Sequence, residues 1–225
     1  QYLVHKLIIA TREDEGASED IGLPVHTARL CPNCGYGHFG SQLDEDLCKA
    51  CDTPLEGGLL LDKLYGVEHV STRRVTQITS DEEERLRMGY EMQTTLQYAL
   101  EEGRLQVVRT AFTEGGEDLV EIHYGPAATV WRINLGWRRR RNASIYGFNI
   151  DVSTGVWSKD DQAPPDDEVQ TEEARNVLRI VPFVEDRRNV LVLFPRQELS
   201  EGEIASLQYA LKRGVESVFQ LEESE

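Results

Sequence analysis

The stretch CPNCGYGHFGSQLDEDLCKAC, residues 31–51, contains all four cysteines of this 225-residue chain. Cys31 and Cys34 are separated by two residues, and Cys48 and Cys51 repeat that spacing after thirteen intervening residues. Two CxxC pairs at this separation are typical of a site in which four thiolates surround one Zn²⁺ ion. The segment therefore predicts a four-cysteine zinc ribbon.

The residues beside the cysteines suit such a site. Pro32 stiffens the first turn, and Gly35 can take the positive φ that is needed after the second ligand. Lys49 would offset part of the negative charge of four thiolates. His38 would be a ligand only in place of a cysteine, and we expect its side chain to be exposed. Four sulfurs leave no open coordination position, so the predicted zinc is structural and not catalytic.

Two other uses of the cysteines stay open. Two disulfides would require an oxidising compartment. The N-terminal sequence QYLVHKLIIATRED lacks a basic leader, an apolar block and a small-residue cleavage site, so we expect a cytoplasmic protein. A redox-active CxxC pair would leave the second pair without a role.

The overall composition is that of an acidic globular protein. Hydrophobic residues make up 40% of the chain and charged residues 28%, which suits one large domain or two small ones. No run approaches the roughly 18 apolar residues of a membrane helix. The net charge of −16 opposes a dedicated nucleic-acid-binding module, although a local basic path is compatible with it. The chain does not begin with Met, and we expect it to be a piece of a longer polypeptide.

Alternating apolar and polar residues predict a series of strands in the middle of the chain. In the first, Tyr90, Met92 and Leu96 share a parity that we expect to face the core. In the fourth, Trp131 and Leu135 share such a face. Short Gly-containing turns between the strands predict an antiparallel meander. The five predicted strands cover residues 90–101, 105–112, 119–124, 128–139 and 145–152.

Two capping boxes predict helices. Ser80 with Glu83 begins a short helix that ends at Gly89, and Ser200 with Glu203 begins an amphipathic one, for which Gly214 is the expected C-cap. Between them, residues 176–195 predict a hairpin that turns at 185–188. Residues 218–223 predict a last strand. The apolar face of the second helix comprises Ile204, Leu207, Leu211 and Val215.

These elements predict an α+β fold, a four-cysteine zinc ribbon followed by an antiparallel β meander with a few short helices. The ribbon and its flanking strands occupy residues 1–66, where we expect Gly66 to break the last strand, and the meander with its short capped helix occupies 67–158. Residues 159–174 form an acidic, Pro-containing loop. Residues 175–225 supply the hairpin, the amphipathic helix and the terminal strand, which pack on the meander.

The dense basic cluster of the chain is GWRRRRN, residues 136–142. Its arginines could contact phosphates while the neighbouring indole stacks on a base. The alternative is a charged hairpin turn that neutralises nearby acidic residues. The candidate nucleic-acid residues are Trp137, Arg138, Arg139, Arg140 and Arg141. No GxSxG elbow, HExxH motif or paired-carboxylate spacing is visible, so we predict no catalytic residue in this chain.

The order of motifs resembles a known family. After the CPNCG and CKAC pairs come ITSDEEERLRMGYE, WRINLGWRRR, GFNID, FVEDRRNVLVLFP and LQYALKRGVESVFQLEESE. This order resembles the zinc-binding C-terminal region behind the motor core of large prokaryotic superfamily-two (DEAD/DEAH-type) helicases. A related region occurs in the helicase-partner protein of the DISARM phage-defence system. The resemblance covers most of the chain from about Leu30 onward.

This resemblance implies a non-catalytic accessory domain of an ATP-dependent DNA helicase or translocase, in phage defence or DNA processing. ATP would be hydrolysed by a motor in cis or in trans, and the chain would guide DNA or pack on that motor. Carried over by position, the zinc ligands are the four cysteines. The alternative function is a protein–protein scaffold in a defence complex, without nucleic-acid contact. A stand-alone enzyme would need a pocket of converging titratable groups that the sequence does not indicate.

Overall fold

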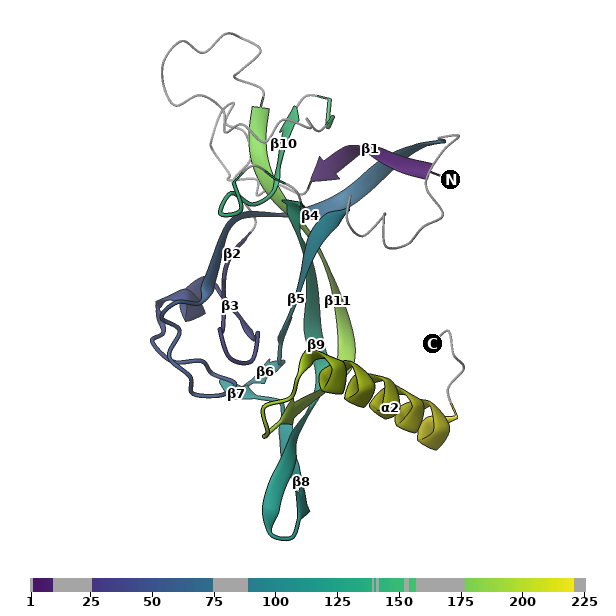
Figure 1. Cartoon of the computed structure of the whole chain (residues 1–225). Helices are drawn as coiled ribbons and strands as arrows, with labels where there is room; N and C mark the ends of the chain where they lie inside the picture. The colour runs from purple at the N-terminus through teal and green to yellow at the C-terminus, as the bar shows by residue number, and fades with distance from the viewer. Residues whose placement is uncertain are drawn as a thin grey trace. The chain divides into compact units, whose positions relative to one another are not determined.

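The computed structural model describes residues 2–9, 26–74, 89–138, 140, 142–151, 154–156 and 177–220 (Figure 1). The chain divides into two compact units. Unit 1 combines Gln1–Leu105 with Ala127–Arg188, and unit 2 combines Gln106–Pro126 with Asn189–Glu225. These units cut across the predicted sequence ranges, because each is assembled from two separate stretches of the chain. Among the described residues, no helix is long and apolar enough to cross a membrane.

Strands dominate the described residues (Figure 1). The single α-helix among these residues is α2, Glu201–Phe219, and a 3-10 helix, η1, covers Gly40–Asp44. The strands are β1 Tyr2–Ile9, β2 His26–Leu30, β3 Gly37–Phe39, β4 Leu59–Arg74, β5 Tyr90–Gln97, β6 Leu100–Glu101, β7 Arg104–Leu105, β8 Val108–Glu114, β9 Glu117–Trp137, β10 Phe148–Asp151 and β11 Val177–Pro195.

The main sheet has nine strands and is mixed. Its order is β3-β2-β4-β11-β9-β5, with β1 paired to β4, β10 to β11 and β8 to β9. β11 runs parallel to β4, where Val181–Phe183 pair with Leu64–Gly66. This order differs from the predicted meander, since β5 lies beside β9 and not beside the next strand of the chain. The predicted helix that begins at Ser80 lies outside the described residues.

Three predicted strand breaks are wrong, because the chain stays extended through them. Gly66 remains in β4, where its backbone pairs with Phe183 of β11. Gly125 and Pro126 lie inside β9, which pairs with β8 up to Tyr124 and with β5 from Thr129. Each half of β9 therefore has its own partner strand, and proline occupies the interval between them, where no donor to β8 or β5 is required. Residues 185–188 likewise continue β11 and form no turn.

The core of unit 1 confirms the predicted face of β9. Trp131 and Leu135 are buried, and Ile133 between them is fully inaccessible. The Trp131 ring stacks on Phe39 with centroids 4.3 Å apart and lies 4.7 Å from the Phe183 ring. The rest of this cluster comes from β2, β4 and β11: Ala28, Leu30, Leu61, Leu64 and Val181. Strands far apart in the sequence thus share one apolar core.

The predicted face of β5 is wrong beyond its first residue. Tyr90 packs inward, 4.8 Å from the Trp137 ring, but Met92 is 48% exposed. Thr95, which has the opposite parity, is 3% exposed. The pairing with β9 shifts between Glu91 and Met92, and such a bulge exchanges the two faces of a strand.

A close approach of backbones explains one glycine. Gly147 has φ +86°, and a Cβ on it would lie 2.0 Å from the carbonyl oxygen of Ile180 in β11. Its amide donates to the carbonyl of Leu135 in β9 at 2.9 Å. Gly147 therefore allows the segment before β10 to contact two strands at once.

The amphipathic helix is confirmed and is longer than predicted. In α2 the Ser200 side chain accepts from the Glu203 amide, and the Glu203 side chain accepts from the Ser200 amide. The helix passes through Gly214 and ends at Gln220, which has a left-handed φ of 54°. The predicted strand from Val218 is therefore wrong at its start, where Val218 and Phe219 are helical.

Candidate metal centre

The two CxxC turns adopt the same backbone geometry. The amide of Gly35 donates to the Cys31 carbonyl at 3.0 Å, and the amide of Asp52 donates to the Cys48 carbonyl at 2.8 Å. Gly35 and Asp52 both have left-handed φ values, 71° and 57°. The positive φ predicted for Gly35 is confirmed. In each turn, a backbone hydrogen bond closes a tight loop, and the two cysteines of the pair belong to that loop.

The four sulfurs form a compact group. Cys31 Sγ lies 3.6 Å from Cys51 Sγ, and Cys34 Sγ lies 3.7 Å from Cys48 Sγ. All four ligand atoms lie within 4.8 Å of one another, so the cluster could hold a metal ion. Metal–sulfur bonds of about 2.3 Å in a tetrahedron give sulfur–sulfur edges of about 3.8 Å. The four thiols are free, and their separations exceed the roughly 2.05 Å of a disulfide bond.

The thiols differ in acidity before any cation binds. A hydrogen bond from the Cys34 thiol lowers the pKa of Cys48 to about 3; burial acts in the opposite direction, and His38 adds a smaller lowering. The same contact with Cys48, together with burial, raises the pKa of Cys34. Burial raises the pKa of Cys31. Cys48 is therefore the more acidic thiol of the hydrogen-bonded pair Cys34 and Cys48.

Backbone and side-chain donors surround this thiolate cluster. The amide of Ala50 donates to Cys48 Sγ at 3.4 Å, and Asn33 Nδ2 donates to Cys51 Sγ at 3.7 Å. Hydrogen bonds of this kind stabilise the charge of metal-bound thiolates. Lys49, which we expected to offset that charge directly, pairs with Glu45 at 2.7 Å.

His38 does not have the predicted exposure. Its side chain on β3 is fully buried, and its ring lies edge-on to Tyr36 with centroids 5.2 Å apart. Among the described residues, neither ring nitrogen has a partner at ordinary hydrogen-bond geometry. Its approach to Cys48 contributes to the lowered pKa of that thiol. His38 is thus a buried polar group beside the sulfurs, which the sequence alone did not indicate.

Strand β5 anchors the first CxxC turn to the sheet. Thr95 Oγ1 donates to the Gly35 carbonyl at 2.6 Å, and an isolated bridge joins Tyr36 to Leu96. A nearby side-chain contact joins Gln97 to Gln42 of η1 at 3.2 Å. The bulge that turns Thr95 inward therefore also attaches the cysteine segment to the core.

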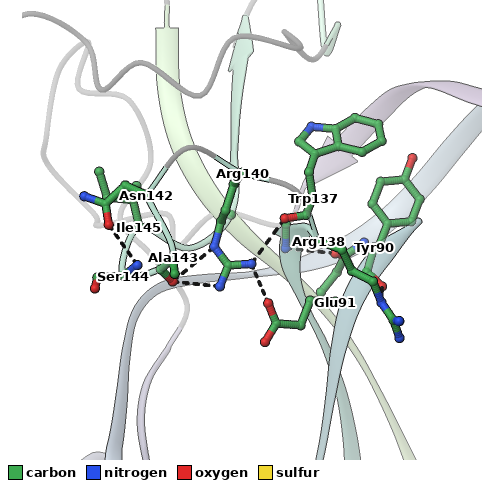
Figure 2. Close-up of polar contacts among 12 residues, drawn as sticks. Tyr90, Glu91, Trp137, Arg138, Arg140, Asn142, Ala143, Ser144 and Ile145 are labelled. Atoms are coloured by element: carbon green, nitrogen blue, oxygen red, sulfur yellow. Dashed lines mark hydrogen bonds and ion pairs between the residues drawn. The ribbon is translucent and has the colours of Figure 1, made fainter. Parts of the chain in front are cut away.

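The described part of the arginine cluster makes many contacts within the chain (Figure 2). Arg140 donates to Glu91 at 2.5 Å, to the Trp137 carbonyl at 3.2 Å, and to the Ala143 carbonyl at 2.7 and 3.1 Å. Its side chain is only 6% exposed, and its guanidinium lies 5.0 Å from the centroid of the Tyr146 ring. Arg140 therefore closes the turn that follows β9.

The other predicted nucleic-acid residues have different settings. Arg138 is exposed and donates to the Tyr90 carbonyl at 3.3 Å. Trp137 is partly buried against Tyr90 and Phe148. Arg139 and Arg141 lie outside the described residues. Contact between this cluster and nucleic acid stays a prediction.

Sequence reasoning missed a second structural arginine. Arg179 on β11 is 8% exposed and donates to the Tyr146 carbonyl at 2.7 Å and to Asn149 Oδ1 at 3.2 Å. It also donates to the Gly147 carbonyl at 3.2 Å. The sequence feature that indicates this role is the single arginine within the apolar stretch NVLRIVPFV, because a buried guanidinium must donate to acceptors inside the protein.

Among the residues whose burial is described, unit 2 contains a second buried histidine, His123. His123 lies on the same face of β9 as Glu121, and its Nε2 is 2.7 Å from the Glu121 carboxylate. The carboxylate also pairs with Arg196. The hydrogen bond with His123, followed by Arg196, lowers the pKa of Glu121. These contacts tie β9 to the segment after β11.

No protein-family model, curated protein or solved structure matches this chain. The relation to helicase C-terminal regions and to DISARM therefore rests on the sequence motifs alone.

Proposed function

We propose that the four cysteines hold one structural Zn²⁺ ion, and that the chain is a non-catalytic accessory module of a larger assembly. The arrangement of Cys31, Cys34, Cys48 and Cys51 carries this proposal, since two sulfur pairs at 3.6 and 3.7 Å suit a tetrahedral ion. Four thiolates occupy every position of such an ion, so no position remains for a substrate or an activated water molecule. The ion would stabilise a loop-rich segment that has few apolar residues of its own.

The residues around the cysteines support a resident metal. Unneutralised thiolates this close together would repel one another, and the surrounding donors include Asn33 and the Ala50 amide. When bound, the ion would supply the positive charge that holds both CxxC turns together. The donor set is all sulfur, which favours Zn²⁺ over the oxygen-seeking Mg²⁺ and Ca²⁺.

The assembly that this module serves is an ATP-dependent DNA helicase or translocase, in DNA processing or phage defence. This part of the proposal is supported by the order of sequence motifs, and the motor would be in cis or in trans. The module would act by packing on the motor. The net charge of −16 and the contacts of Arg140 within the chain favour a protein partner over direct contact with DNA.

Guidance of DNA is the second candidate function. The exposed Arg138, within a run of four arginines beside Trp137, favours it. An electrostatic contact with phosphates would weaken steeply with added salt.

Metal analysis and DNA titration test these proposals separately. Chain purified under reducing conditions without chelator should contain one zinc per molecule, and Co²⁺ substitution should give the absorption of a tetrahedral thiolate site. Cys34→Ser and Cys51→Ser variants should lose the ion, whereas wild-type chain without any bound metal would overturn the zinc proposal. Hydrolysis of ATP or DNA by the purified chain would overturn the non-catalytic role.

For DNA, fluorescence anisotropy with labelled single-stranded and duplex oligonucleotides should be measured at several salt concentrations. The packing proposal predicts no binding by the wild type at physiological salt. Salt-dependent binding that is lost in Arg138→Glu, but kept in Arg188→Glu, would establish the guidance function instead. Arg188 is a matched control because it is 70% exposed and distant in sequence from the cluster.

A further inference from the structure

Helix α2 of unit 2 has an apolar face that the described part of its unit covers only in part. None of its 19 residues is buried. Ile204 is 51% exposed and Val215 is 36% exposed, although both lie on the face that an amphipathic helix normally buries. Val218 and Phe219 extend the apolar residues of the helix to its C-terminus with exposures of 75% and 69%. A soluble domain rarely exposes a contiguous apolar stripe of this kind unless another molecule binds there.

The stripe borders a groove and is not a flat surface. A cavity of about 550 Å³ lies between α2 and the end of β11. Strand β11 contributes Leu191, Leu193 and Pro195, and α2 contributes Ile204, Leu211 and Val215. The lining residues of α2 run from Ile204 to Glu216, and with a rise of about 1.5 Å per residue they provide a wall of about 18 Å, a little more than three helical turns. A groove of these proportions suits an amphipathic helix laid along it.

The charge of unit 2 indicates which kind of helix would fit. Residues 106–126 and 189–225 contain eleven acidic and four basic side chains, a net charge of −7. Lys212 and Arg213 on α2 are already paired with Glu216 at 3.6 and 3.0 Å. An acidic unit disfavours a second copy of itself and attracts a segment that carries basic residues beside its apolar face.

We propose that the groove between α2 and β11 docks a basic amphipathic helix from a partner protein. Apolar side chains of that helix would enter between Leu191, Ile204 and Leu211, and its lysines or arginines would face the acidic surface of unit 2. This inference rests on the proposal that the chain acts by packing on another protein, and it names the surface and the chemistry of that contact. It is independent of the metal centre, because all the residues of the groove belong to unit 2.

The probe is a fluorescein-labelled 18-residue Leu/Lys peptide patterned to fold as an amphipathic helix. It is titrated against the zinc-loaded full chain by anisotropy at low and physiological salt. We expect saturable binding at one site. A scrambled peptide of the same composition, which lacks the apolar face, and a Leu/Glu peptide of the same pattern should both bind at least tenfold more weakly.

Matched variants locate the site. Ile204→Asn and Val215→Asn should each weaken binding of the Leu/Lys peptide about tenfold, which corresponds to about 1.4 kcal/mol, because each removes part of the apolar surface that the peptide would bury. Tyr209→Asn should bind within twofold of the wild type, since Tyr209 is 62% exposed on the same helix and lies outside the groove. Circular dichroism of all three variants must match the wild type, and the two groove variants provide independent tests if one misfolds.

Several outcomes would overturn the inference. They are absence of binding, equal binding of the scrambled peptide, and equal affinity of the wild type and both groove variants. Sedimentation equilibrium provides a further check, because a dimer that is broken by Ile204→Asn would make a second copy the occupant. Zinc content and DNA binding are measured on the same samples, so failure of the groove is distinguishable from failure of the proposed function.

Discussion

Replacement of Arg140 by alanine tests whether the arginine cluster holds the fold or serves an external ligand. The guanidinium is almost completely buried, and it donates to one carboxylate and two carbonyls. A hydrogen bond to a charged partner contributes about 1.5 to 3 kcal/mol, and neutral ones contribute about 1 kcal/mol each. Glu91 is 44% exposed, and Ala143 is exposed, so water would solvate both after the substitution and reduce the cost.

From these contacts we expect Arg140→Ala to lower the free energy of unfolding by about 2 to 3 kcal/mol. For a chain of this length, that loss corresponds to a decrease in Tm of about 4 to 12 °C. Arg138→Ala is the matched control, because it removes the same charge from a neighbouring position. Arg138 is exposed and makes one long hydrogen bond, so its loss should change stability by no more than about 0.5 kcal/mol.

The assay is urea unfolding of the zinc-loaded chain, followed by tryptophan fluorescence and far-ultraviolet circular dichroism. A Glu91→Gln variant and the double variant complete a thermodynamic cycle, which isolates the coupling between Arg140 and Glu91. Equal losses for Arg138→Ala and Arg140→Ala would refute the reasoning. An unchanged stability of Arg140→Ala would refute it as well.

Three further predictions follow from individual contacts. Gly147→Ala should destabilise the chain by about 3 kcal/mol or more in the same urea assay, since the added Cβ would collide with the Ile180 carbonyl. Gly202→Ala on α2 is the control and should be neutral or slightly stabilising, because no atom lies within 4 Å of its added Cβ. His38→Phe keeps a ring against Tyr36 but removes both nitrogens, so we expect chelator-driven zinc release to become about 10- to 100-fold faster. A release rate equal to that of the wild type would show that the His38 ring does not stabilise the metal-bound sulfurs. Glu121→Gln should remove a pH-dependent part of the stability, because the lowered pKa of Glu121 stabilises the folded chain above the unfolded pKa of about 4.3, and this stabilisation is lost as the pH falls below that value. The free energies of unfolding of variant and wild type should therefore differ at pH 7 and converge in acid, and a difference that stays constant with pH would contradict this assignment.

Several features could be predicted from the sequence because they depend on neighbouring residues. The two CxxC turns need only two intervening residues and a fifth residue that tolerates a positive φ, so the sulfur cluster was predictable. The capping box at Ser200 involves groups three residues apart, and it is confirmed. The inward face of β9 at Trp131 and Leu135 was visible because a strand alternates with period two as long as it remains regular.

Other features depended on contacts between distant segments. Local sequence predicted breaks at Gly66 and at Gly125–Pro126, yet β4 and β9 continue through these positions as single strands. One bulge against β9 exchanged the faces of β5 and turned Thr95 toward Gly35. A register shift depends on the partner strand, and no pattern within residues 90–97 specifies it.

Which residues can bind a metal follows from the local sequence, since thiolate chemistry and short loops are local properties. The burial of polar side chains follows from the folded chain instead: His38 lies buried beside the sulfurs, and Arg140 lies buried in the turn after β9. The physical reason is that burial and charge pairing arise when segments more than 40 residues apart come together, as Arg140 does with Glu91. The cost of burying a polar group depends on those distant partners, and the local sequence does not contain them.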